Sequence, residues 1–173
     1  MIEKAFAKRF GNYEHIIEGL PTEAIRTLTG APKITIYHKD KDVESMWQML
    51  NSHEKSDDFI TASTESSDDA KRNLAGLVKG HSYTVLGTVK LTDGKRLVKI
   101  RNPWGKEGFS GAYGGKNTLW DETAKKEAGY LDKNDGIFFT DIETYVMSFS
   151  ETLINIDVED WATTKFMKLD DNS

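Results

Sequence analysis

The spacing of apolar residues along the chain alternates between the repeat of short helices and that of short strands. Residues 2–10 and 42–51 carry apolar side chains at helical spacing, whereas residues 33–38 alternate as a strand does. Met46 and Trp47 lie on the apolar stripe of the second helical segment, which is typical of core packing. Further strands are expected at 59–63, 136–140 and 149–157, and further helices at 120–128, at 141–147 and from an N-cap at Thr22 to Gly30.

The clearest tertiary prediction comes from two strand-like runs, 81–91 and 95–102, which flank an Asp93-Gly94 turn signal. His81 begins the first run and Asn102 ends the second. The pattern therefore makes these two residues candidates to meet across a β-hairpin.

The register of this hairpin decides whether the two side chains can touch. A two-residue turn would place Asn102 opposite Val85 and His81 opposite Lys106. The side chains of His81 and Asn102 would then share a face but lie roughly 13 Å apart. We therefore predict a longer or asymmetric connection, with a β-bulge at Gly87 as one way to achieve it.

A histidine beside an amide has a specific chemical use. Imidazole acts as a general base only when its second nitrogen is held in one tautomer, and an amide oxygen does this without adding a charge. That arrangement suits a cysteine nucleophile, because a thiolate–imidazolium pair needs no third charge. The chain contains no cysteine, so it cannot supply the thiol itself. Ser82 is excluded as a substitute, since neighbouring residues of a strand point to opposite faces.

Composition narrows the class of protein further. The 173 residues are 38% hydrophobic and carry a net charge of −5, which fits one globular core and argues against a nucleic-acid partner. No apolar run approaches the ~18 residues of a membrane span, and the charged N-terminus does not resemble a signal peptide. We therefore expect no membrane partner and a cytoplasmic location. The glycine-rich residues 105–115 match neither a phosphate-binding loop nor a nucleophile elbow.

Two motifs at the ends of the predicted hairpin are similar to those of a known family. Residues 80–85, GHSYTV, and residues 100–105, IRNPWG, resemble the GHAYSV and IRNPWG signature of calpains, which are papain-like cysteine endopeptidases of the cytoplasm. The segments EKAFAK and GNYE near the N-terminus and DGIFF at 135–139 resemble calpain EKAYAK, GSYE and DGEFW. The resemblance covers about residues 2–157, in order.

The resemblance implies an α+β fold, in which short helices flank a mostly antiparallel β-sheet or barrel-like subdomain of the papain-like protease core. Residues 1–157 would be the second half of that core. In it, His81 would be the general base, Asn102 its orienting partner and Trp104 the ring that shields the pair from water. Residues 158–173 would be a linker and possible first strand of a following β-sandwich domain.

The same resemblance implies what this chain lacks. The catalytic cysteine would come from the first half of the protease core, in the same parent chain. The substrate would be a polypeptide, and the chain by itself would be inactive.

The calcium site that calpains carry in this half is interrupted here. The acidic positions implied by the resemblance fall on Gly108, Gly115 and Ile137, and only Asp135 remains. We therefore predict no metal and no cofactor in this chain, with Asp135 at most a vestige of the site. Calcium binding elsewhere in the parent protein stays open.

Both the function of the chain and the role of Trp104 have alternatives. A non-catalytic, calpain-like module that binds a partner would carry the same motifs, although it would not need both His81 and Asn102. Trp104 has several possible roles as well: it would shield the pair, obstruct the cleft as its counterpart does in calcium-free calpains, or simply pack.

Overall fold

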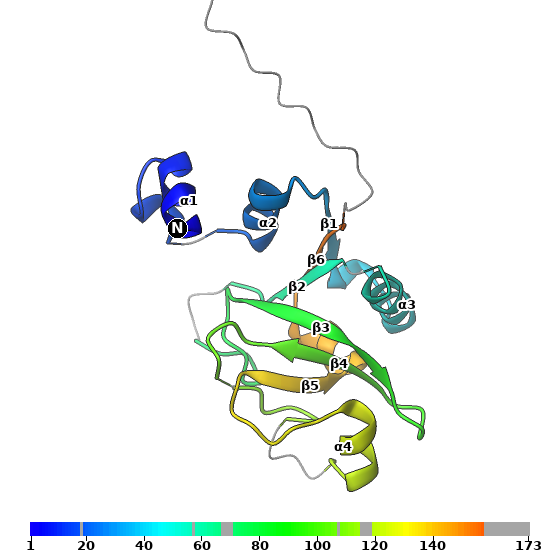
Figure 1. Cartoon of the computed structure of the whole chain (residues 1–173). Coiled ribbons are helices and arrows are strands. Elements are labelled where there is room, and N and C mark those ends of the chain that lie inside the picture. The colour runs from blue at the N-terminus through cyan, green and yellow to red at the C-terminus, as the bar shows by residue number, and fades with distance from the viewer. Residues whose placement is uncertain (18, 57, 67–70, 107, 115–118, 158–173) are drawn as a thin grey trace, which may run out of the picture.

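A computed structural model describes residues 1–17, 19–56, 58–66, 71–106, 108–114 and 119–157. Six strands form one antiparallel sheet in the order β1-β6-β2-β3-β4-β5 (Figure 1). The sheet is open, since within these ranges β1 and β5 are its two edges, and the predicted α+β class is confirmed. The strands are β1 Lys33–Tyr37, β2 Phe59–Ser63, β3 Ser82–Lys90, β4 Arg96–Arg101, β5 Ile137–Asp141 and β6 Glu151–Asn155.

Short helices flank the sheet, and aspartates begin three of them. Asp42, Asp121 and Asp141 each accept a hydrogen bond from the backbone N–H three residues later, which satisfies a donor that the helix leaves free. The helices are α1 Ile2–Phe10, α2 Pro21–Thr29, α3 Val43–Glu54, α4 Glu122–Ala128 and α5 Ile142–Ser148, with 3-10 turns η1 Glu14–Ile16 and η2 His38–Asp40.

The predicted N-cap at Thr22 is wrong. The α2 helix starts at Pro21, and Leu20 occupies the cap position. Proline favours the first helical position because its fixed φ suits the helix and its missing N–H is not needed there. Thr22 is instead fully buried in the first turn.

Both faces of the sheet are covered, so the β3–β4 hairpin lies between two apolar layers. On one face, Met46 and Leu50 of α3 pack with Ile100 of β4, and all three are fully buried. On the other face, Trp120 and Phe139 belong to a second cluster that includes α4. The predicted core role of the α3 stripe is confirmed, and both strands of the hairpin are held firmly by packing.

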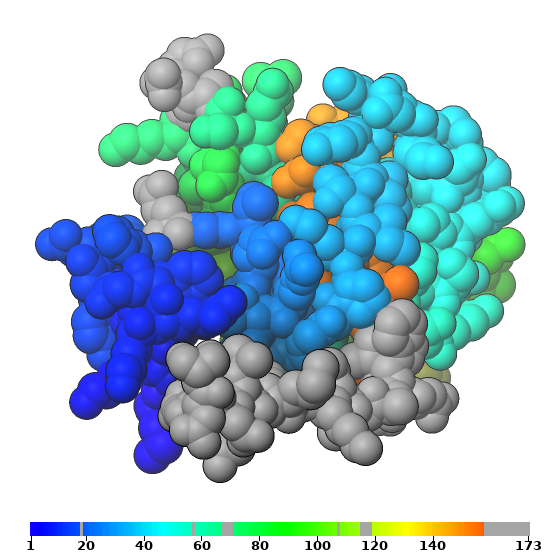
Figure 2. Space-filling view, turned by 90° about the horizontal axis from the view of Figure 1, so that it is seen from above, coloured from blue at the N-terminus to red at the C-terminus, as the bar shows by residue number. Residues whose placement is uncertain are grey.

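The N-terminal helices α1 and α2 lie on the opposite side of the view from α3 in Figure 1. The N-terminal residues also form one edge of the space-filling view (Figure 2). Large apolar side chains remain exposed along this segment: Ile2, Phe10, Tyr13, Ile17, Leu20 and Leu28. In the described part of the chain, no helix has the length and apolar character needed to cross a bilayer. The strand predicted within residues 158–173 lies outside the described residues.

Candidate active site

The structure brings His81 and Asn102 together at the open end of the hairpin. His81 comes directly before β3 and Asn102 directly after β4. The Nε2 atom of His81 lies 3.0 Å from Oδ1 of Asn102, which is a hydrogen-bond distance. The predicted contact between the two side chains is therefore present.

An asymmetric connection produces this contact, as predicted. At the turn, Leu91 N donates to Lys95 O and Gly94 has a φ of 89°, the features of a hairpin loop that ends in a left-handed residue. Farther along, the ladder shifts by one residue between Val85 and Gly87, which is a β-bulge.

Direct opposition of the two side chains is not required. Beyond the bulge, Thr84 lies opposite Arg101, and this register continues to place Tyr83 opposite Asn102. His81 is then a diagonal neighbour of Asn102 on the same face, at a separation that side chains can bridge. The observed register shift is smaller than direct opposition of the two residues would need, because this diagonal contact is sufficient.

Hydrogen bonds fix the orientation of the Asn102 amide. Its Nδ2 donates to the carbonyl of Lys106 at 2.9 Å, and its Oδ1 accepts from the backbone N–H of Trp104 at 3.1 Å. Asn102 is 5% exposed, so both ends of the amide need these partners. Because Oδ1 can only accept, Nε2 of His81 carries the hydrogen and Nδ1 keeps its lone pair. No described residue forms a hydrogen bond with that Nδ1.

Thr64 holds the backbone of His81 in place. Its hydroxyl accepts from the His81 N–H at 3.1 Å and donates to the carbonyl of Val78 at 2.7 Å. The backbone N–H of Thr64 also donates to the His81 carbonyl at 3.1 Å. Thr64 is buried. Only its position directly after a predicted strand hinted at this role.

The Asp135-Gly136 turn supports Asn102 from the other side. The Asn102 N–H donates to the Gly136 carbonyl at 2.9 Å. Gly136 has a φ of 86°, and a Cβ there would lie 2.7 Å from the Asn102 carbonyl oxygen, so glycine is required. Asp135 accepts from the N–H of Ile137 at 3.0 Å. The DG motif therefore has a structural reason that does not involve calcium.

Trp104 lies against the histidine. The ring centroids of Trp104 and His81 are 4.3 Å apart, with the planes tilted by 38°. Trp104 is 63% exposed, so it covers one side of the imidazole while facing solvent with the rest of its surface.

The remaining candidates lie elsewhere. Ser82 pairs through its hydroxyl with Ser63 on β2 at 3.0 Å, as expected for a side chain on the opposite face from His81. Among the described residues, no group of three or more His, Asp or Glu side chains could hold a metal ion. Gly115 lies outside the described residues, so the predicted loss of the calcium site stays a prediction.

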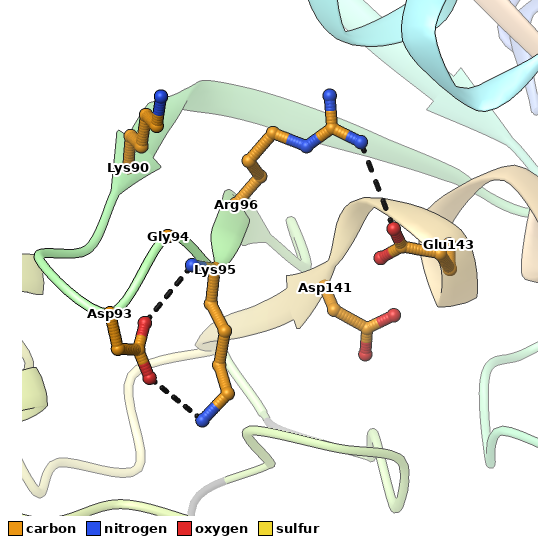
Figure 3. A pocket seen from close by; sticks show the side chains of 7 residues that line it. All are labelled: Lys90, Asp93, Gly94, Lys95, Arg96, Asp141 and Glu143. Carbon is orange, nitrogen blue, oxygen red and sulfur yellow. Dashed lines mark hydrogen bonds and ion pairs between the residues drawn. The ribbon is translucent and has the colours of Figure 1, made fainter.

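A surface pocket of about 560 Å³ lies at the opposite end of the hairpin (Figure 3). Most of its charged groups are already occupied: Lys95 pairs with Asp93 at 2.8 Å, and Arg96 lies 3.7 Å from Glu143. The pocket is remote from His81 along β3 and contributes nothing to the histidine site. Its lining residues are Lys90, Asp93, Gly94, Lys95, Arg96, Asp141 and Glu143.

The chain is similar in sequence to known proteins. Residues 1–155 match the family described as calpain family cysteine protease. The chain is 33% identical to human calpain-14 over 154 residues, which is 86% of this chain and 22% of that protein. It is 30% identical to a calpain-type cysteine protease of Arabidopsis thaliana over 86% of this chain and 7% of the plant protein. A Caenorhabditis elegans calpain is 30% identical over 87% of this chain and 20% of its own length.

Proposed function

The chain belongs to the calpain family of cysteine proteases, and we propose that it is the His/Asn half of a cysteine endopeptidase. The observation that carries this proposal is the fixed Nε2–H tautomer of His81, set by Asn102 Oδ1 at 3.0 Å. This tautomer leaves Nδ1 able to take a proton from a thiol. A module that only binds a partner has no need of that arrangement.

The proposed mechanism needs one thiol from the other half of the core. Nδ1 of His81 takes the thiol proton, and the thiolate attacks the carbonyl carbon of the scissile peptide bond. The Nδ1–H then protonates the leaving amine, so that the C–N bond breaks and a thioester remains. Water attacks the thioester after losing a proton to Nδ1, and the thiolate leaves as the acid product forms.

Asn102 and Trp104 serve that cycle without reacting. The neutral amide of Asn102 holds the ring through each protonation step, because the imidazolium also donates from Nε2. Trp104 covers one face of His81 and limits water there, which strengthens the hydrogen bond beneath it.

The exposed N-terminal segment supports docking of the cysteine-bearing half. Ile2 of α1, Ile17 directly after η1 and Leu28 of α2 are 67%, 76% and 58% exposed, so this segment leaves large apolar side chains uncovered. We propose that the first half of the protease core covers them. The parent would act on polypeptides in the cytoplasm, and this half would require neither metal nor cofactor.

The test is peptide cleavage by the full-length protein. We expect thiol-dependent turnover that falls by about 10²–10⁴ in His81→Ala, with a smaller loss in Asn102→Ala. Ser82→Ala is the matched control on the opposite face of β3 and should cleave normally. The present chain alone should show no turnover. Absence of a cysteine from the full-length protein, or equal activity in all variants, would favour the partner-binding module.

The predicted loss of the calcium site is tested by a separate measurement. Calorimetric titration of this chain with calcium should show no saturable binding in the micromolar range. Saturable binding that weakens in Asp135→Asn would show that the site survives despite the glycines.

A further inference from the structure

The face on which Asn102 lies depends on one bulged residue, Leu86. From the turn to Gly87, the ladder pairs Gly87 with Lys99, and the same register continued would place Asn102 opposite Thr84. Thr84 and His81 point to opposite faces of β3, because side chains alternate along a strand. The extra residue at the bulge moves Asn102 opposite Tyr83 and so onto the face of His81.

The last residue of α3, Glu54, contacts β3 directly next to this bulge. Its carboxylate accepts from the backbone N–H of Thr88 at 2.9 Å and also, in a short hydrogen bond, from the Thr88 hydroxyl. A Cβ at Gly87 would lie 2.5 Å from Glu54 Oε1, so the carboxylate fills the space that a larger residue would need. The carboxylate and the glycine are therefore fitted to each other.

The edge of β3 explains why a side chain is needed here. The pairing of β2 with β3 ends where Ile60 lies opposite Val85. Beyond that point β2 offers no backbone acceptor to the N–H of Thr88, and Glu54 supplies one. A hydrogen bond to a charged acceptor stabilises more than one to a neutral acceptor.

We propose that Glu54 is a positioning residue for the His81–Asn102 pair. It lies about 20 Å from His81 along β3, given the rise of a strand, and does not touch either member of the pair. It acts by favouring the bulged ladder over the regular one, and the ladder decides which face Asn102 occupies. Only the consequence for catalysis rests on the proposed function.

The test measures the register of the β3–β4 ladder and the hydrogen bond of His81 directly, without measuring enzyme turnover. In NMR spectra of this chain we expect a contact between the α-protons of Tyr83 and Asn102 and a Nε2–H proton of His81 that exchanges slowly with water. Glu54→Ala should weaken both signals and enhance exchange of the Nε2–H by about tenfold or more, as expected for a lost hydrogen bond. Glu44→Ala, on the same helix, should change neither signal.

Deletion of Leu86 provides the decisive rescue. It leaves Val85 opposite Ile100 and Gly87 opposite Lys99 but makes the ladder regular, so no bulge remains to be held. We expect the Glu54→Ala chain without Leu86 to recover both NMR signals. A residue that merely stabilised the fold would not be rescued in this way.

Several outcomes would overturn the proposal. Both signals surviving in Glu54→Ala would do so, as would their loss without recovery when Leu86 is deleted. If Glu54→Ala does not fold, Thr88→Val, which removes only the hydroxyl donor, should still speed exchange of the His81 Nε2–H, and unchanged exchange would reject the idea. None of these measurements needs a cysteine. The role of Glu54 can therefore be rejected or supported independently of the proposed function. In the full-length enzyme, kcat should fall in Glu54→Ala with KM little changed, and return on deletion of Leu86.

Discussion

The surroundings of His38 and of His81 show how one residue type serves two purposes. His38 is 4% exposed, and both of its ring nitrogens are engaged. Nδ1 lies 3.2 Å from the carbonyl of Val146 and therefore donates, while Nε2 accepts from Thr152, 2.7 Å away. Tyr145 in turn lies 2.6 Å from the Thr152 hydroxyl and completes a buried chain of hydrogen bonds.

His81 differs in the nitrogen that is left available. Its Nε2 donates to Asn102, whereas Nδ1 has no hydrogen-bond partner among the described residues. The two histidines therefore carry their hydrogens on opposite nitrogens. His38 stabilises the junction of α5 and β6, whereas His81 keeps the lone pair of Nδ1 available. Burial and the number of occupied nitrogens distinguish the two roles, and sequence position alone does not.

The largest expected effect is a contrast in stability between the two histidines. His38→Ala should lower the free energy of unfolding by about 2–4 kcal/mol, because it leaves a cavity and removes the buried hydrogen bonds of the ring to Val146 and Thr152. His81→Ala should cost less than about 1 kcal/mol, since the ring is only half-buried. Urea unfolding of both variants measures the difference. Equal losses would show that the two histidines contribute alike to the stability of the fold.

Two glycines allow the effect of a steric clash next to Asn102 to be separated from the effect of a strained backbone. Gly136 and Gly94 have φ angles of 86° and 89°, yet only at Gly136 would a Cβ meet other atoms, 2.7 Å from the Asn102 carbonyl. Gly94→Ala should cost about 1 kcal/mol from the left-handed backbone alone. Gly136→Ala should cost about 2–3 kcal/mol and displace Asn102. Matching losses in urea unfolding would mean that the close contact relaxes freely.

The pH dependence of stability should reflect His38. Burial lowers the pKa of His38 below its ordinary 6.5, against the opposing effect of backbone carbonyls. Protons therefore bind the unfolded chain more strongly than the folded one. The contribution of His38 to the free energy of unfolding is constant above pH 6.5 and falls as the pH drops below it, by at most about 1.4 kcal/mol per pH unit.

The control for this pH effect is His38→Gln, which keeps a buried polar side chain without a titrating ring. Its stability should fall less steeply than that of the parent chain between pH 6.5 and pH 5 in urea unfolding experiments. Identical slopes would assign the effect to other groups.

The smallest effect is expected at the charged pocket of Figure 3. Arg96 lies 3.7 Å from Glu143, whose side chain is 58% exposed, so the pair is largely screened by water. Glu143→Gln should leave the urea midpoint nearly unchanged, and any shift should vanish in 1 M salt, where the Debye length is about 3 Å. A large shift that persists in high salt would show that the Arg96–Glu143 pair contributes substantially to the stability of the fold.

Much of the fold follows from local pattern. The apolar stripe with Met46 and Trp47 predicted α3, and the Asp93-Gly94 signal placed the hairpin turn within its observed loop. Helix and strand boundaries shifted by a few residues, as at β6, predicted over 149–157 and found at Glu151–Asn155. Such ends depend on tertiary hydrogen bonds that a local pattern does not encode.

The supporting residues of the site were not predicted. Thr64 and Glu54 act through backbone groups of distant segments, at His81 and Thr88. The position of Thr64 after a predicted strand is a weak hint, and the sequence around Glu54 gives none. A hydroxyl or carboxylate in a loop or at a helix end is usually solvated, so its role becomes visible only when the partner strand is in place.

The sequence by itself determined that a histidine and an asparagine stand at the two ends of one hairpin, and that no cysteine accompanies them. Only the tertiary structure decided that the two side chains meet. The reason is the alternation of side chains along a strand: a register shift of one residue exchanges the faces. The choice of register lies in a bulge that α3 contacts from outside the hairpin.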